Sequence, residues 1–191
     1  MGHADLANSE ELRTARLSLR RPTPADIDAI HRVHSDPRAC AHNPGDALAS
    51  RTEAEQLYQR WDGHWHRNGF GYWTVRGHVP SDQPLGFCGI KLMELHGLTI
   101  LNLFYRLDPS AWGNRIATEA ATAVVDWATT HLPDRPLVAR VRPDNTASLK
   151  VAVRAGLRRA PHLDTAGEDG LDWIFTSNWP DNADPARDPR A

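Results

Sequence analysis

The middle of the chain holds a strand, a tight loop and the start of a helix, in an order that can bind an anion. Residues 104–120 read FYRLDPSAWGNRIATEA. The N-terminus of a helix presents unpaired N–H groups and a partial positive charge of roughly half an elementary charge. Gly113 lets the backbone come close to a ligand, and Ala117 leaves the first helical turn unobstructed. The segment therefore predicts a phosphate or pyrophosphate site, although ordinary connections of this form are common.

A second group of polar residues opens a helix further along the chain. Residues 143–150 read PDNTASLK, and Gly156 follows as the expected C-terminal stop of that helix. Asn145 and Ser148 are three residues apart, so both project from one face of the first turn. On local grounds alone, Asp144 or Asn145 is an N-cap and Ser148 is an ordinary first-turn residue.

The two motifs together resemble the GNAT family of N-acetyltransferases. Segment 112–120 is similar to the coenzyme A pyrophosphate loop of that family, above all to the RimJ/RimL-like branch that acetylates ribosomal-protein N-termini. That branch tends to carry Trp-Gly-x-Gly-x-Ala-Thr-Glu-Ala here, then Asn-x-x-Ser and a helix ending in Gly-Phe. The resemblance covers about residues 16–176. It implies the GNAT acyltransferase fold and transfer of an acetyl group from acetyl-coenzyme A to a primary amine, either a protein N-terminal α-amine or a small amine.

The resemblance also implies how the chain would hold acetyl-coenzyme A. Tyr105, Arg106 and Leu107, on the central strand, are expected to pair through their backbone with the pantetheine arm. The pyrophosphate is expected to be wrapped by Trp112, Gly113, Asn114, Arg115, Ile116, Ala117 and Thr118. Asn145 is expected to contact the cofactor near its reactive end, and Ser148 is the candidate catalytic residue that donates to the departing thiolate.

Two positions depart from the pattern of the family. Arg115 stands where the family has glycine; its backbone N–H remains available, and its guanidinium either contacts phosphate or crowds the loop. Asn102 stands where the branch often has a catalytic glutamate, three residues before Tyr105, and an amide cannot accept a proton from an amine. Glu94 and His96, at the end of the preceding strand, are the alternative catalytic bases, although a solvated turn residue is the commoner interpretation of each.

The lack of a carboxylate at position 102 favours an acceptor amine that loses its proton easily, or a base acting through water. A lysine-like amine titrates near ~10.4, whereas a chain N-terminal α-amine titrates near ~7.7–8.0. A backbone N–H near Leu107 is expected to stabilise the oxyanion. Two alternatives stay open: a catalytically weak, acyl-coenzyme A-binding sensor or regulatory subunit, suggested by Asn102 and Arg115, and a longer acyl group as the natural donor.

The pattern of apolar residues predicts the elements that position these groups. Strands are expected at 16–21, 69–76, 85–94, 98–107, 137–141 and 171–176, and helices at 23–33, 51–67, 114–130 and 145–155. This succession of strands and helices predicts a mixed α/β sheet in a single domain. The domain is expected at 13–179, between a flexible tail at 1–12 and a disordered tail at 180–191.

Specificity for the acceptor is expected to reside in the first two helices and the loop at 36–50. On the second helix, Trp61 and Trp65 are expected to line or cover the acceptor cleft together with His64 and His66. The two histidines are two residues apart and do not share a helix face, so no metal site is expected there or elsewhere.

Composition excludes several other classes of protein. The 191 residues carry a formal net charge of −2 with a pI of about 6.5, which does not suit a nucleic-acid-binding domain. No apolar run approaches the roughly 20 residues of a membrane helix, and residues 1–11 lack the apolar core of a secretory signal. Cys40 and Cys88 are expected to be free thiols in the cytoplasm. The oligomeric state is not readable, and a homodimer is compatible with the sequence.

Overall fold

The computed structural model describes residues 11–78, 83–167 and 169–180. The strands are β1 (Glu11–Arg13), β2 (Leu17–Arg20), β3 (Tyr72–Gly77), β4 (Gly86–Leu95), β5 (Leu98–Leu107), β6 (Leu137–Val141), β7 (Arg158–Arg159), β8 (Thr165–Gly167) and β9 (Gly170–Ser177). The α-helices are α1 (Ile27–Ser35), α2 (Arg51–Asn68), α3 (Ile116–His131) and α4 (Thr146–Arg154). None of the helices in these ranges is long and apolar enough to cross a membrane.

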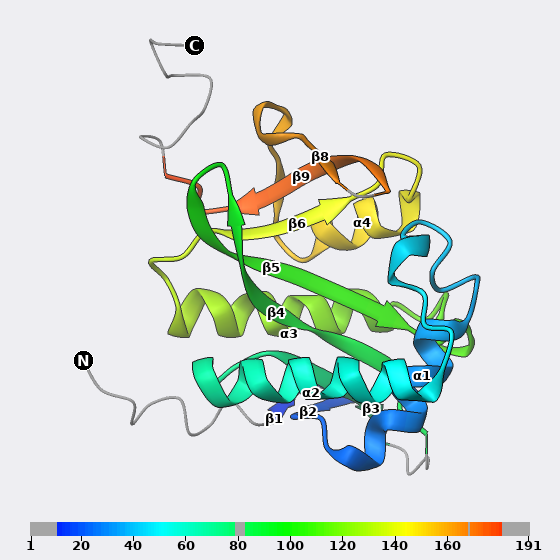
Figure 1. Cartoon of the computed structure of the whole chain (residues 1–191). Helices are drawn as coiled ribbons and strands as arrows, with labels where there is room; N and C mark the ends of the chain where they lie inside the picture. The colour runs from blue at the N-terminus through cyan, green and yellow to red at the C-terminus, as the bar shows by residue number, and fades with distance from the viewer. Residues whose placement is uncertain (1–10, 79–82, 168, 181–191) are drawn as a thin grey trace.

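The strands form one mixed sheet, as the sequence predicts. Their order is β1-β2-β3-β4-β5-β6-β9-β7, and β8 pairs with β9 beside it (Figure 1). β4 and β5 pair along their whole lengths through the turn at His96 and Gly97, so β5 has a continuous partner on one side. Within the described sheet, β5 and β6 form the parallel pair, and α3 connects them.

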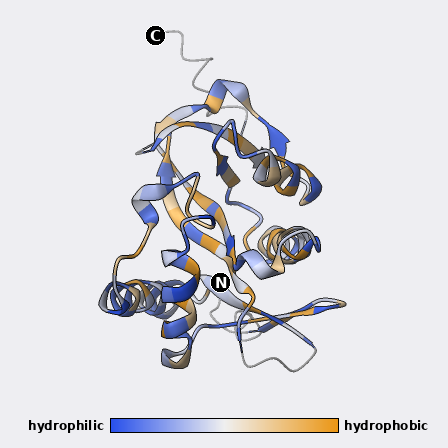
Figure 2. Cartoon of the chain, turned by 90° about the vertical axis from the view of Figure 1, so that its right-hand side faces the viewer, coloured by the Kyte–Doolittle hydropathy of each residue, from blue (hydrophilic) through white to orange (hydrophobic). Residues whose placement is uncertain are grey.

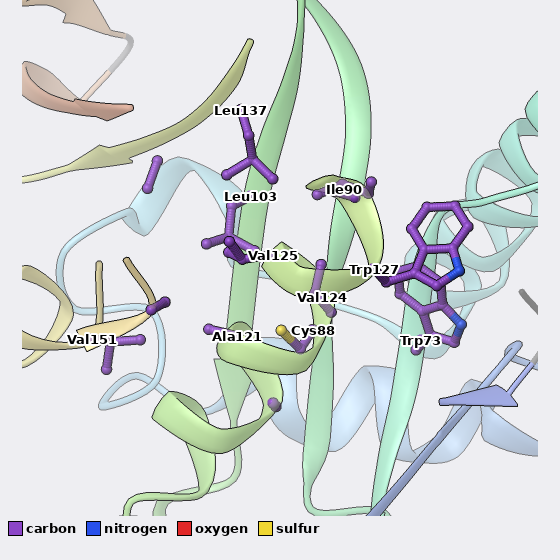
Figure 3. Close-up of a cluster of buried hydrophobic side chains, with 14 of the residues drawn as sticks. Trp73, Cys88, Ile90, Leu103, Ala121, Val124, Val125, Trp127, Leu137 and Val151 are labelled. Carbon is purple, nitrogen blue, oxygen red and sulfur yellow. The ribbon is translucent and has the colours of Figure 1, made fainter. Parts of the chain in front are cut away.

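Helices cover both faces of the sheet, α1 and α2 on one and α3 and α4 on the other (Figures 1 and 2). The sequence of β4 is apolar at consecutive positions because both faces of this strand are buried. Phe87 packs in the cluster with α1 and α2, whereas its neighbour Cys88 packs in the cluster with α3 and α4. Figure 3 shows the second cluster, in which Val124 of α3 and Trp73 of β3 are fully buried.

The helices begin and end at residues suited to those positions. The Ser50 hydroxyl caps α2 by accepting from the Glu53 N–H, and Gly69 ends that helix in the left-handed region at φ 74°. The apolar residues of α1, Ile27, Ile30 and Val33, face the sheet as their spacing predicts. Cys40 and Cys88 are buried free thiols, as expected.

Three short strands were not expected from the sequence. β7 and β8 contain two and three residues, too few to show an alternating pattern of their own. β1 includes Glu11 and Leu12, which corrects the assignment of residues 1–12 to a flexible tail. Residues 1–10 of that tail, and 181–191 of the predicted C-terminal tail, lie outside the described residues.

The close approach of β3 and β4 yields a stability prediction. A Cβ atom on Gly89 would overlap the backbone of Gly71 and Tyr72, so Gly89→Ala should lower the free energy of unfolding by about 1–3 kcal/mol. Gly63 is the matched control, because a Cβ there meets only the end of the Arg67 side chain, at 3.3 Å. Gly63→Ala, inside α2, should raise the stability by about 1 kcal/mol. Denaturant unfolding measures both, and equal effects would contradict the packing described.

Candidate active site

The parallel pairing of β5 with β6 stops before either strand ends. Its last register pair is Leu103↔Ala139, although β5 continues to Leu107 and β6 to Val141. Beyond this point the strands diverge (Figure 1). We call the opening the β5–β6 gap.

The edge of β5 presents backbone amides to the β5–β6 gap. The Leu101 N–H donates to the Pro136 carbonyl at 2.8 Å, so the backbone groups of every second residue from Leu101 face the β6 side. Tyr105 and Leu107 therefore face the gap. Among the described residues, no backbone acceptor takes the N–H of either, as the pairing with β6 has ended. Two sheet-like donors are thus available to an extended ligand.

Arg106 has the opposite orientation, and this corrects one expected contact. It pairs with Phe87, and the next even-numbered residue, Asp108, donates its N–H to the Leu85 carbonyl of the β4 side at 2.9 Å. The backbone groups of Arg106 are therefore directed to β4 and cannot pair with a ligand in the gap. Its side chain points to the face covered by α1 and α2.

Two aromatic side chains border the β5–β6 gap. The Tyr105 hydroxyl donates to the Ser148 carbonyl at 3.1 Å, which links β5 to α4. Burial raises the pKa of Tyr105, so this hydroxyl remains a donor at neutral pH. The Trp112 indole N–H donates to the Leu107 carbonyl at 3.1 Å, although 47% of Trp112 is exposed.

The loop before α3 leaves the start of that helix accessible. Gly113 and Arg115 have left-handed backbones, with φ of 77° and 60°. α3 consequently starts at Ile116, two residues later than predicted, and Arg115 provides no side-chain cap, whereas Ser50 and Asn145 cap α2 and α4. The Arg115 side chain is exposed and leaves the first-turn N–H groups open to an anion.

An ion pair fixes this loop to the sheet. Arg16, just before β2, binds Glu119 in the first turn of α3 at 2.6 Å and donates to the Asn114 carbonyl at 3.1 Å. Thr14 also donates to Glu119. Burial would raise the pKa of Glu119, but these hydrogen bonds outweigh it and hold the pKa below its ordinary value. The carboxylate thus remains charged at neutral pH.

Asn145 is the N-cap of α4, one of the two candidates, Asp144 and Asn145, that the sequence offered. The Asn145 Oδ1 accepts from the Ser148 N–H at 3.0 Å, so one lone pair of this oxygen is engaged, and its second lone pair and the amide nitrogen remain for a ligand. The Ser148 side chain is half-buried, and its hydroxyl has no hydrogen-bond partner in the described chain.

A cavity of about 690 Å³ lies on the α1–α2 face of β5. It is lined by residues from α1 (His34), the loop before α2 (43, 45–48), α2 (Trp61), β5 (Asn102) and β6 (Arg140), among others. The loop at 36–50 and the first two helices, where acceptor specificity is expected, therefore contribute to the lining of this cavity. Asn102 contributes its amide nitrogen to the Tyr72 hydroxyl, whose pKa is raised chiefly by burial.

Charged side chains crowd the cavity. Its lining carries the cations Arg60, Lys91, Arg106, Arg140 and Arg142 and the carboxylates Asp46, Glu53, Asp169 and Asp172. Arg140 and Arg142 both bind Asp172, at 2.5 and 2.9 Å. Arg106 binds Asp46 at 3.0 Å. The described lining thus has one cation more than it has carboxylates.

His34 is buried in this lining as a neutral side chain. It packs against Trp61, Phe87 and Phe104, and its Nδ1 lies 3.0 Å from the Ile30 carbonyl. Burial, together with the nearby Arg106 cation, lowers the pKa of His34 to about 3. At neutral pH Nδ1–H therefore donates to Ile30, and Nε2 is an acceptor.

The structure does not bring the other candidate bases to the cavity. Glu94 is exposed beside the β4–β5 turn and accepts from the Thr99 hydroxyl at 2.5 Å. His96 lies in that turn, 3.0 Å from the Leu163 carbonyl. Neither lines the cavity.

Of the aromatic group expected on α2, Trp61 lines the cavity and the rest lie elsewhere. Trp65 is buried, and its indole N–H donates to the Tyr72 carbonyl at 2.9 Å. His64 bridges elements, with Nδ1 2.9 Å from the Phe70 carbonyl and Nε2 accepting from the Leu92 N–H at 3.2 Å. His66 lies beside Asp62 on the same helix.

Several lining residues were missed by the sequence analysis. Arg140 lies on β6 and Asp172 lies on β9, both within segments interpreted only as strands, and Arg142 lies just beyond β6. A charged residue inside an apolar strand was the available signal, because a buried charge requires a partner. His34 and Tyr72 carried no comparable signal, since each is ordinary for its helix or strand.

Comparison with known proteins agrees with this architecture. The model of the acetyltransferase (GNAT) domain matches residues 16–158. The chain therefore belongs to the GNAT family of N-acetyltransferases, as the two sequence motifs predicted.

Solved structures share the fold over most of their lengths. An acetyltransferase from Agrobacterium tumefaciens is 27% identical with a TM-score of 0.74, over 88% of this chain and 94% of that one. The ribosomal-protein α-N-acetyltransferase RimL, in complex with coenzyme A, is 18% identical with a TM-score of 0.70, over 88% and 97%. A spermidine N-acetyltransferase from Vibrio cholerae, with coenzyme A and spermine, is 18% identical with a TM-score of 0.68, over 86% and 96%.

The left-handed backbone at Arg115 predicts a stabilising substitution. Arg115→Gly should raise the free energy of unfolding by about 0.5–1 kcal/mol, because glycine adopts this conformation without strain. Gly113→Ala is the matched control, and it should lower the free energy of unfolding by about 1 kcal/mol. Nothing lies within 4 Å of the added Cβ, so the loss would come from the left-handed backbone alone. Thermal unfolding measures both, and a loss of stability in Arg115→Gly would contradict the strain.

The buried neutral His34 predicts a pH dependence of stability. Since its pKa is about 3 in the folded chain and near 6.5 when unfolded, the unfolded state binds more protons between these values. Its contribution is therefore complete above about pH 6.5 and is lost as the pH falls. Between about pH 3 and pH 6.5, His34→Phe should lower the slope of the free energy of unfolding against pH by up to about 1.4 kcal/mol per pH unit. Parallel slopes for the two proteins would contradict a neutral, buried His34.

Proposed function

We propose that the protein transfers an acetyl group from acetyl-coenzyme A to a primary amine bound in the cavity. The observation that carries this proposal is that β5 borders both sites. Its Tyr105 and Leu107 amides face the β5–β6 gap, and its Asn102, Phe104 and Arg106 line the cavity. A donor in the gap and an acceptor in the cavity would therefore meet at this strand.

The residues present suit acetyl-coenzyme A. The unpaired amides of β5 fit the amide groups of a pantetheine arm, and the uncapped start of α3 fits a pyrophosphate. The bound thioester would supply the activated acetyl group. RimL and the spermidine enzyme both bind coenzyme A, which supports the assignment without fixing its geometry here.

Ser148 is the proposed donor to the departing thiolate. Its hydroxyl has no competing partner in the described chain and lies on the first turn of α4, next to the contact with Tyr105. A leaving thiolate requires such a donor, because a thiol of this kind titrates near ~8.5. The Leu107 N–H also faces the gap without a partner, but it lies next to the loop proposed to hold the pyrophosphate, so we assign it to the pantetheine arm and not to the oxyanion.

The proposed acceptor is an amine of low pKa, above all a protein N-terminal α-amine. Asn102 cannot take a proton, and the pKa of His34, about 3, makes it a weak base at neutral pH. An α-amine titrates near ~7.7–8.0 and needs little deprotonation, unlike a lysine-like amine. A small amine of similar pKa would serve equally.

Thiol release from acetyl-coenzyme A, measured against amines of increasing pKa, tests this function. At pH 7 the α-amines of short peptides should react faster than lysine-like amines, and the difference should shrink as the pH approaches ~10. Binding of acetyl-coenzyme A without transfer to any amine would instead identify the acyl-coenzyme A-binding sensor, the alternative that Asn102 suggests.

A carboxylate at the start of α3 should weaken cofactor binding without unfolding the chain. Thr118→Glu places a negative charge in the first turn, where it favours the helix but repels a pyrophosphate. The dissociation constant of the Thr118→Glu variant for coenzyme A, measured by calorimetry, should rise about tenfold or more. Thr122→Glu, one turn further along α3, adds the same charge as a control and should change it little. Equal losses in both variants would contradict a pyrophosphate at this helix start.

A further inference from the structure

Two polar side-chain atoms on β5 are buried without a hydrogen-bond partner. They are Asn102 Oδ1, an acceptor, and Arg106 Nη1, a donor. Both side chains line the cavity of about 690 Å³, from the same face of the strand. Most buried polar groups in folded proteins are paired, so two orphans on one cavity wall indicate groups that a ligand completes.

Arg106 is the more demanding of the two. Only 6% of its side chain is exposed, and it is held from one side, by Asp46 to Nη2 at 3.0 Å. Asp46 itself is 55% exposed, so much of its charge is screened by solvent. The inner nitrogen of the guanidinium therefore has no protein acceptor among the described residues, which is costly for a buried cation.

The other charges of the cavity do not supply the missing acceptor. Asp172 is engaged by Arg140 and Arg142, and Glu53 accepts from the Ala49 N–H at 2.6 Å. Asp169 lies 3.9 Å from Arg142. The lining keeps an excess of one cation over its carboxylates, and the Arg106 charge is felt as far as His34, whose pKa it helps to lower after burial.

We propose that the acceptor amine carries a carboxylate, which accepts from Arg106 Nη1 while the amine donates to Asn102 Oδ1. This inference rests on the proposed function and names its class of acceptor. A guanidinium with an inner N–H that lacks an acceptor is the side chain best suited to bind a carboxylate. Asn102 precedes Leu103, the last residue of β5 paired with β6, so the amine lies beside the β5–β6 gap. A polyamine, all cationic, meets Arg106 and its neighbours with like charge.

Matched ligands that differ by one carboxylate test this proposal. We would titrate two sets into the protein saturated with coenzyme A and measure binding by calorimetry. The first set is amide-capped tripeptides in which Ser-Asp-Ala is compared with Ser-Asn-Ala. The second is amines joined to a carboxylate by one to six methylenes, each compared with its amide, together with spermidine.

In at least one set the carboxylate member should bind about tenfold or more tightly than its amide. A preference in the peptide set points to a protein N-terminus, and one in the second set points to a small amino acid. Arg106→Gln should abolish the preference. Arg154→Gln, an exposed arginine at the end of α4 outside the cavity, is the charge-matched control and should keep it.

Asp46→Asn is a second test that does not depend on whether Arg106→Gln folds, because it leaves Arg106 in place and removes the carboxylate that competes for it. The preference should persist and grow in this variant. Equal binding of carboxylates and amides in both sets, tighter binding of spermidine, or a preference that survives Arg106→Gln would overturn the inference. Thiol release in the same samples separates the two claims: transfer without a carboxylate preference defeats this inference alone, and no transfer to any amine defeats the proposed function.

Discussion

The loss of pairing between β5 and β6 is the feature on which the rest of the site depends. A parallel pair that continued past Leu103 would satisfy the Tyr105 and Leu107 amides and leave no room for an extended ligand. The cost of leaving these groups unpaired is limited by the links that surround the gap. Tyr105 donates to α4, and Trp112 donates to the Leu107 carbonyl. The strands can therefore separate while each remains fixed to the fold, β5 through β4 and β6 through β9.

The strand that borders the gap also separates two chemical environments. Its backbone edge and the start of α3 offer N–H groups, which suit a polar, anionic donor molecule. Its side chains on the α1–α2 face enter a cavity of paired charges in which Arg106 and Asn102 keep unfilled hydrogen-bonding capacity. The alternation of a β-strand places these two environments within one residue of each other, without any loop having to carry both.

Sequence reasoning predicted the regular elements better than it predicted the cavity. β5 matched its predicted bounds because its apolar run is closed by Asp108 and Pro109. Three strands, β1, β7 and β8, are too short to show an alternating pattern of apolar residues. They form because they pair with the neighbouring strands β2 and β9. The orientation of Arg106 depends on its register with β4, which the motif does not encode. The cavity joins His34 to Arg142, distant in the chain, so only the folded sheet reveals their proximity.

Hydrogen exchange of individual amides, with and without coenzyme A, tests the central claim most directly. The account predicts that exchange at Tyr105 and Leu107 slows when the ligand binds, because their N–H groups gain an acceptor in the gap. The Arg106 amide between them is directed to β4 and should change little. Saturation with coenzyme A that leaves Tyr105 and Leu107 unprotected would contradict the account.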